Sequence, residues 1–96
     1  EINEPIKVGA VFSRGEVRPV WFSWNGRQVK IRETAFTWKS REGNAVILHF
    51  SVTDGHGLYE VCYNMGNLGW MITRSEDQEM LFSPQRTQRS QRKAKA

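Results

Sequence analysis

The sequence contains a single cysteine, Cys62, and this scarcity excludes any disulfide within the chain. Reduced cysteine is typical of proteins in a reducing compartment, so we expect a cytoplasmic location. Long apolar runs are also missing: the longest covers residues 45–48, far short of the roughly 20 residues that a membrane-spanning helix needs. No basic stretch followed by an apolar one occurs near Glu1, and we expect neither a signal peptide nor a membrane partner.

Acidic residues and large aliphatic or aromatic residues are absent from residues 83–96. The basic residues of this segment are Arg86, Arg89, Arg92, Lys93 and Lys95. Because the segment has no large apolar side chain to bury, we expect it to be a basic disordered tail. Two roles stay open for the tail: a phosphate-binding arm, or a short end that only increases solubility.

The rest of the chain, residues 1–82, is nearly neutral, with nine basic and ten acidic residues. The formal net charge of +4 therefore comes from the tail. This length suits one hydrophobic core and is too short for two. We expect a single β domain over residues 1–82, followed by the tail.

Two alternating apolar runs flank Asn25-Gly26, a pattern typical of a β-hairpin with a two-residue type I′ turn. Asn and Gly tolerate the positive φ angles that this turn requires. The predicted register pairs Trp24 with Arg27, Phe22 with Val29, Trp21 with Lys30, and Arg18 with Glu33. Phe22 and Val29 would then share an apolar face, and Trp21 would point the opposite way.

Turn residues recur about every ten residues and separate six stretches with strand character. These stretches are residues 6–12, 17–24, 27–38, 45–53, 58–64 and 70–74, and we expect the third to be long and bent. Pro19 has no amide hydrogen, which predicts a bulge or an unpaired edge beside it. The expected fold is all-β: an antiparallel meander of about six strands curled into a small barrel or sandwich.

A short C-terminal helix is expected to cover one end of the sheet. Ser75 is a suitable N-cap, Gln78 takes the third helical position, and the acidic residues between them suit the positive end of the helix dipole. Pro84 limits the helix to about two turns, which would place Met80, Leu81 or Phe82 over the sheet.

Several aromatic and glycine positions form a pattern along the middle of the chain. They are Phe22, Trp24, Gly26 and Arg27 of the hairpin, then Trp38, residues 58–64 (LYEVCYN) and residues 69–74 (GWMITR). In these features the chain resembles a group of small prokaryotic proteins of unknown function that share a Phe-x-Trp-x-Gly-Arg hairpin. The chain departs from that pattern at Val29, where an aromatic residue is expected. The resemblance implies an all-β fold and brings no activity, cofactor or catalytic residue with it.

Side chains suited to catalysis or metal binding are sparse. His49 and Cys62 lie in predicted strands, and His56 lies in a glycine-flanked turn after Asp54. A free cysteine in a strand is most often a small buried residue, and these four residues lack the close spacing of a structural zinc site. The sequence therefore predicts no enzyme, no metal site and no other cofactor.

Aromatic and basic residues alternate on the predicted hairpin. Trp21, Lys30, Arg32 and Arg27 would form a surface that stacks on bases and contacts phosphates, and Arg86, Arg89 and Arg92 of the tail would add affinity. In the competing interpretation, the tryptophans fill a small core and the cationic side chains cover their rings.

Two functions therefore stand as hypotheses. The leading one is a non-enzymatic binding module for single-stranded nucleic acid. The alternative is a protein-interaction or homo-oligomerisation module that uses a sheet edge or an aromatic patch. Trp21 separates the two best, because it is exposed among cations if the sheet is covered on one face only. The sequence indicates no small-molecule site.

Overall fold

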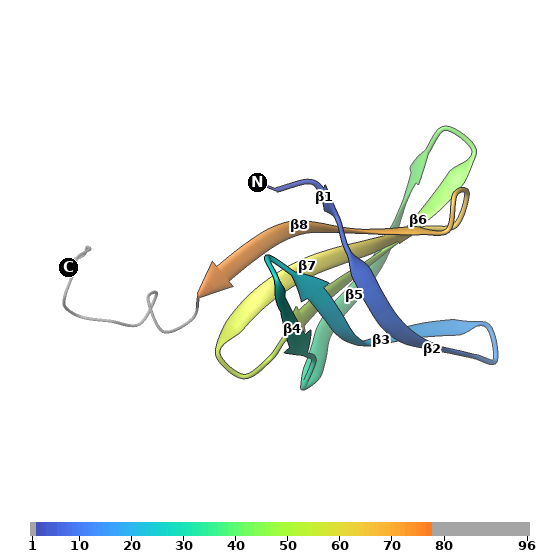
Figure 1. Cartoon of the computed structure of the whole chain (residues 1–96). Helices are drawn as coiled ribbons and strands as arrows, with labels where there is room; N and C mark the ends of the chain where they lie inside the picture. Colours follow the sequence, from blue (N-terminus) through green and yellow to red (C-terminus); the bar gives the residue numbers. More distant parts are fainter. Residues whose placement is uncertain (1, 78–96) are drawn as a thin grey trace, which may run out of the picture.

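A computed structural model describes residues 2–77 of the chain. Within that range every regular element is a β-strand, and the strands form two antiparallel sheets (Figure 1). The larger sheet has the order β1-β8-β7-β6-β5, and the smaller sheet has the order β2-β3-β4. The strands are β1 Glu4–Pro5, β2 Lys7–Ser13, β3 Glu16–Trp24, β4 Arg27–Lys30, β5 Glu33–Glu42, β6 Ala45–Thr53, β7 Gly57–Asn64 and β8 Gly69–Asp77. The all-β prediction is confirmed.

The hairpin of β3 and β4 has the predicted turn and register. Asn25 and Gly26 have φ angles of 54° and 76°, as a type I′ turn requires. Phe22 pairs with Val29, and both side chains are buried. The two-residue loop and the apolar alternation therefore fix this part of the fold without help from distant contacts.

The third predicted strand is divided where the chain passes from one sheet to the other. The Ile31 N–H donates to Val20 O in the smaller sheet at 3.0 Å, whereas the next N–H, that of Arg32, donates to Thr53 O in the larger sheet at 2.8 Å. One ladder ends and another begins within one residue. The predicted pairing of Arg18 with Glu33 is wrong, because Glu33 pairs with Thr53.

The first predicted strand corresponds to β2, and a short strand that the sequence does not predict, β1, precedes it in the other sheet. The Ile6 N–H donates to Trp70 O in the larger sheet at 3.1 Å, and β2 then pairs with β3 in the smaller sheet. In Figure 1 β1 leads directly into β2. The structure therefore has eight strands where six are expected. The chain passes between the two sheets at two corners, so the strands do not form one continuous hydrogen-bonded ladder. The fold is two packed sheets and not a closed barrel.

A bulge lies beside Pro19, as predicted. Gly9 pairs with Trp21 and Ala10 pairs with Pro19, which leaves Val20 as the extra residue on β3. Because proline donates no backbone hydrogen bond, the interruption of the ladder falls where a donor is missing.

The predicted helix does not begin at Ser75. Ser75 pairs with Tyr59 and Glu76 pairs with Leu58, so both residues extend β8 along β7. Strand pairing with a neighbour that is already in place overrides a capping signal whose local preference is small. Residues 78–82, the rest of the predicted helix, lie outside the described residues. From residue 2 to residue 77 the structure has no helix long and apolar enough to cross a membrane.

The core lies between the two sheets. Phe22 and Val29 from the smaller sheet pack in one cluster with residues of the larger sheet, among them Phe50, Val52, Tyr59, Val61 and Ile72. The rings of Phe22 and Tyr59 meet edge-to-face with centroids 5.2 Å apart. At the hairpin tip the Trp24 indole N–H donates to Glu4 Oε1 at 2.9 Å, which ties the smaller sheet to β1.

Candidate functional site

Trp21, the residue that the sequence singles out, is half-buried on the outer face of the smaller sheet. Its indole lies over Gly9 so closely that a Cβ at residue 9 would overlap the five-membered ring. Because Gly9 has no side chain, the Trp21 ring can pack directly on the backbone of the neighbouring strand. This arrangement favours the structural interpretation of Trp21.

The predicted basic partners of Trp21 divide among three places. Lys30 is exposed and pairs directly with Trp21. Arg32 follows the corner between the sheets, and its Cδ lies 3.0 Å from the Cβ position of Gly55 in the β6–β7 turn. Arg27 is an odd number of residues from Lys30, so it lies on the opposite face, where it borders a polar hollow with Asp54 and Glu76. The structure therefore brings Trp21 and Lys30 together and separates Arg27 and Arg32 from them. The tail residues Arg86, Arg89 and Arg92 lie outside the described residues.

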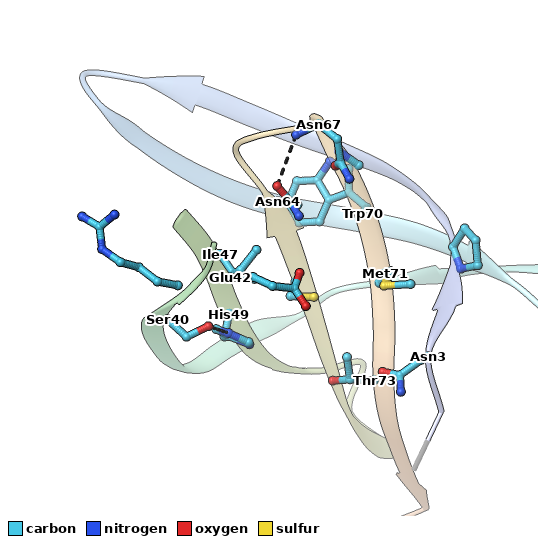
Figure 2. A pocket seen from close by; sticks show the side chains of 14 residues that line it. Asn3, Ser40, Glu42, Ile47, His49, Asn64, Asn67, Trp70, Met71 and Thr73 are labelled. Carbon is cyan, nitrogen blue, oxygen red and sulfur yellow. Dashed lines mark hydrogen bonds between the residues drawn. The ribbon is translucent and has the colours of Figure 1, made fainter. Parts of the chain in front are cut away.

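A shallow hollow of about 470 Å³ lies on the outer face of the larger sheet. Figure 2 shows Ser40 and His49 side by side there, with Met71 and Thr73 on β8 farther along the face. Ser40 Oγ and His49 Nε2 share a hydrogen bond at 2.7 Å, and the His49 ring stacks on Trp38 with an interplanar angle of 2°. In the described part of the chain no acidic group holds the other imidazole nitrogen, as a catalytic triad would require. The pair fastens β5 to β6.

Cys62 lines the same hollow and is buried. Burial raises the pKa of the Cys62 thiol, and the nearby Glu42 carboxylate raises it further. A thiol with a raised pKa is a poor nucleophile and a poor metal ligand at neutral pH. Among residues 2–77 no three His, Cys, Asp or Glu side chains are close enough together to hold a metal ion.

The Asp54 carboxylate organises the turn between β6 and β7. Its Oδ1 accepts hydrogen bonds from the His56 N–H at 2.8 Å and the Gly57 N–H at 2.9 Å. Burial raises the pKa of Asp54, but these backbone hydrogen bonds outweigh burial and hold the pKa below its ordinary value. Asp54 is thus a turn residue that favours its ionised form.

The free edge of the larger sheet is the longest strand of the fold, the ten-residue β5. Glu42 and Ala45 flank the two-residue turn that joins β5 to β6, so this pair exchanges both backbone hydrogen bonds. Bonded pairs alternate along an antiparallel ladder, so the bonds to β6 come from Ser40, Trp38 and Phe36. The N–H and C=O groups of the intervening residues point away from the sheet; we call these residues, Thr37, Lys39 and Arg41, the outward residues of β5.

The two faces of β5 differ in chemistry. On the outer face Phe36 is 70% exposed and Trp38 is 41% exposed. The outward residues lie on the other face, and all three are exposed. Neither Lys39 nor Arg41 forms an ion pair with an acidic side chain of residues 2–77. The edge therefore combines unpaired backbone groups with two large aromatic side chains and two cations that have no ion-pair partner among the described residues.

A groove of about 580 Å³ runs beside this edge. Thr37 and Lys39 border it on one side, and Gly15 of the β2–β3 turn and Glu16 at the start of β3 border it on the other. Its apolar lining comes from Val17, Trp38, Leu48, Phe50 and Met65. Phe50 belongs to the buried core, so the groove reaches the core beside the edge of β5.

Comparisons of the chain with protein-family models, curated proteins and solved structures find no significant match. The resemblance to the small prokaryotic proteins with a Phe-x-Trp-x-Gly-Arg hairpin stays a prediction. The features of the candidate site described above therefore rest on the sequence and structure of this chain, without support from a related protein.

Sequence reasoning missed the edge of β5 as a site. The signal is present as Phe36 and Trp38, two aromatic residues two positions apart in the third predicted strand. Alternation places them on one face but does not tell which face is covered. Only the corner at Ile31 and Arg32, which takes β5 out of the smaller sheet, exposes that face and frees the edge.

Proposed function

We propose that this domain is a non-enzymatic protein-interaction module that accepts an extended segment of another protein along the free edge of β5. The observation that carries the proposal is a ten-residue edge strand with outward backbone groups and two exposed aromatic side chains. Such an edge is a template for one more strand.

The character of β5 supports this proposal over the other sheet edges. Natural proteins protect edge strands by keeping them short, by bulges and by charge. The edge strands β1 and β4 have two and four residues, and the edge strand β2 pairs with β3 across the bulge beside Pro19. In β5 the bulge lies at one end, between Thr34 and Phe36, and the run from Phe36 to Glu42 is regular. The charges of Lys39 and Arg41 on this edge disfavour most added strands but not an acidic one.

The nucleic-acid hypothesis draws less support from the described residues. Trp21 packs on Gly9, and two of its three predicted cationic partners lie elsewhere. A stacking platform needs an aromatic face open to bases with cations around it. Binding through Trp21 and the tail stays a prediction, and the experiment below tests it beside the edge proposal.

The test uses peptides selected from a library of random dodecapeptides displayed on phage, with the full chain as bait. Binding is then measured by calorimetry to the wild type, to Thr37→Pro and to Gln28→Pro. Thr37→Pro removes an outward N–H of β5 without touching the ladder to β6, so we expect at least about tenfold weaker binding. Gln28→Pro is the matched control, because it removes an outward N–H from the edge of β4, and we expect it to bind within about twofold of wild type.

Two results would contradict the proposal. One is selected peptides that bind Thr37→Pro as tightly as the wild type. The other combines two findings. A thymidine oligonucleotide of about 20 nucleotides quenches tryptophan fluorescence in a way that weakens with salt and disappears in Trp21→Ala, and no selected peptide requires β5 for binding. The second result would assign the domain to single-stranded nucleic acid.

A further inference from the structure

The chemistry of the two faces of β5 defines what kind of strand fits beside it. On the face that carries the outward residues, the position next to Thr37 adjoins the groove lined by Val17, Leu48, Phe50 and Met65. A side chain that projects from an added strand at this position enters an apolar space, so burial of an apolar group is favoured there.

The next positions on the same face adjoin cations. Lys39 and Arg41 are two residues apart, so alternation places both on the side that carries Thr37, and Arg41, near the end of β5, also borders the hollow on the outer face. Residues directly opposite on adjacent strands interact, and opposite charges stabilise the pairing. An acidic side chain opposite each cation would meet a charge that has no ion-pair partner within residues 2–77.

The outer face adds a third requirement. Phe36 and Trp38 present exposed aromatic rings, and Trp38 is held in place by its stack on His49. Aromatic side chains pair favourably with β-branched ones across neighbouring strands. The two positions opposite them therefore suit valine or isoleucine.

We infer that the partner segment is an acidic extended peptide with one apolar anchor opposite Thr37, β-branched residues opposite Phe36 and Trp38, and acidic residues opposite Lys39 and Arg41. This inference rests on the proposed function and names the ligand class of the same edge. For an antiparallel partner the order is Thr-Glu-Thr-Glu-Val-Leu-Val-Thr, and for a parallel partner it is the reverse.

Charge disfavours two other occupants of the edge. Residues 83–96 of this chain contain five basic residues and no acidic one, so this segment has the same sign as Lys39 and Arg41. A second copy of β5 paired through residues 37–41 would bring the two cations of each chain to one interface, because the acidic residues of β5, Glu33 and Glu42, lie at the ends of the strand. An acidic segment of another protein is the occupant that matches the edge.

The test measures fluorescence anisotropy of four labelled, end-blocked octapeptides with the full chain at low salt. Two are the orders given above; one replaces both glutamates of the better binder with lysine, and one replaces its leucine with serine. We expect the glutamate peptide to bind about tenfold tighter than the lysine peptide. We expect the serine peptide to bind at least about fivefold weaker than the leucine peptide.

A charge exchange on the protein provides the decisive variant. In Lys39→Glu with Arg41→Glu we expect the preference to invert, with the lysine peptide bound tighter. Arg18→Glu with Lys30→Glu is the matched control: it changes net charge equally, at exposed residues away from β5, and the glutamate preference stays. Inversion separates local pairing from the effect of net charge.

Three outcomes overturn the inference. Equal binding of the glutamate and lysine peptides, both lost in Thr37→Pro, shows an edge without the inferred charge preference and leaves the proposed function intact. If library-selected peptides require β5 for binding but none of the four octapeptides binds, the inferred ligand class is also wrong and the proposed function is left intact. Self-association of the wild type that is lost in Thr37→Pro assigns the edge to a second copy.

Discussion

At the scale of single residues, the contact between Trp21 and Gly9 shows how one neighbour decides the role of an aromatic side chain. The sequence places Trp21 opposite Lys30, and the structure agrees. The sequence does not reveal that Gly9 lies on the other side of Trp21, because that pairing depends on the bulge beside Pro19. An indole that looks available for stacking is therefore packed against a backbone.

Replacing Gly9 tests this packing. In Gly9→Ala the added Cβ overlaps the Trp21 ring, and we expect the free energy of unfolding to fall by about 1–3 kcal/mol. Urea denaturation followed by far-ultraviolet circular dichroism measures the change. In the Trp21→Ala background the same substitution has nothing to overlap and should cost much less. Additive costs of the two substitutions would show that the ring does not lie over residue 9.

Asp54 gives a prediction about pH. Its pKa in the folded chain lies below that of the unfolded chain, so its contribution to stability is complete above the unfolded value of about 3.9 and is lost as pH falls through the folded value. We expect Asp54→Asn to lower the free energy of unfolding by about 1 kcal/mol at pH 7, a figure reduced for solvent screening, and by much less near pH 2. Urea denaturation at both pH values measures this difference, with Glu16→Gln as an exposed control. An equal loss at both pH values would contradict the assignment.

Cys62 gives a prediction about reactivity. Its thiol is buried and its pKa is raised by burial and by Glu42. We expect an aromatic disulfide reagent at pH 7 to react with the native chain at least about tenfold more slowly than with the urea-unfolded chain. Glu42→Gln should speed the native reaction slightly, because it removes the smaller cause of the shift. A native rate equal to the unfolded rate would mean that Cys62 is exposed.

At the scale of elements, local signals explain the hairpins and not the corners. Asn25-Gly26 specifies its own turn, so the register from Trp24 to Trp21 follows from nearby residues alone. The change of partner between Ile31 and Arg32 depends on Thr53, which belongs to a distant hairpin. Ser75 fails as a helix cap for the same reason, since Tyr59 provides a strand partner that local propensity does not include. The sequence pattern does not reveal which distant segments pair with each other.

The alternation of hydrogen bonds along β5 gives a prediction about stability. Thr37→Pro removes a donor that points to solvent, so we expect the free energy of unfolding to change by less than about 1 kcal/mol. Trp38→Pro removes a donor to β6 and the stack on His49, so we expect a loss of at least about 2 kcal/mol. Thermal and urea denaturation compare the two variants. A larger loss for Thr37→Pro than for Trp38→Pro would reverse the assignment of inward and outward groups.

At the scale of the whole molecule, the two corners shape the binding surface. They carry the chain between the sheets at Ile6 and at Ile31, so the core is enclosed without one closed ladder. This arrangement leaves a free edge at β5 and a groove beside it. The all-β class and the apolar core positions follow from sequence alternation, whereas the free edge follows from how the corners part the sheets. The proposed function rests on that second property.

The most direct measurement is hydrogen exchange of the β5 amides, residue by residue, by nuclear magnetic resonance with and without the glutamate octapeptide. In the free chain we expect fast exchange at Thr37, Lys39 and Arg41 and slow exchange at Trp38 and Ser40. A bound peptide should slow exchange at Thr37, Lys39 and Arg41 by at least about tenfold, because their N–H groups then donate to the added strand. Slow exchange at these three residues in the free chain, or no change when any selected peptide is bound, would contradict the account.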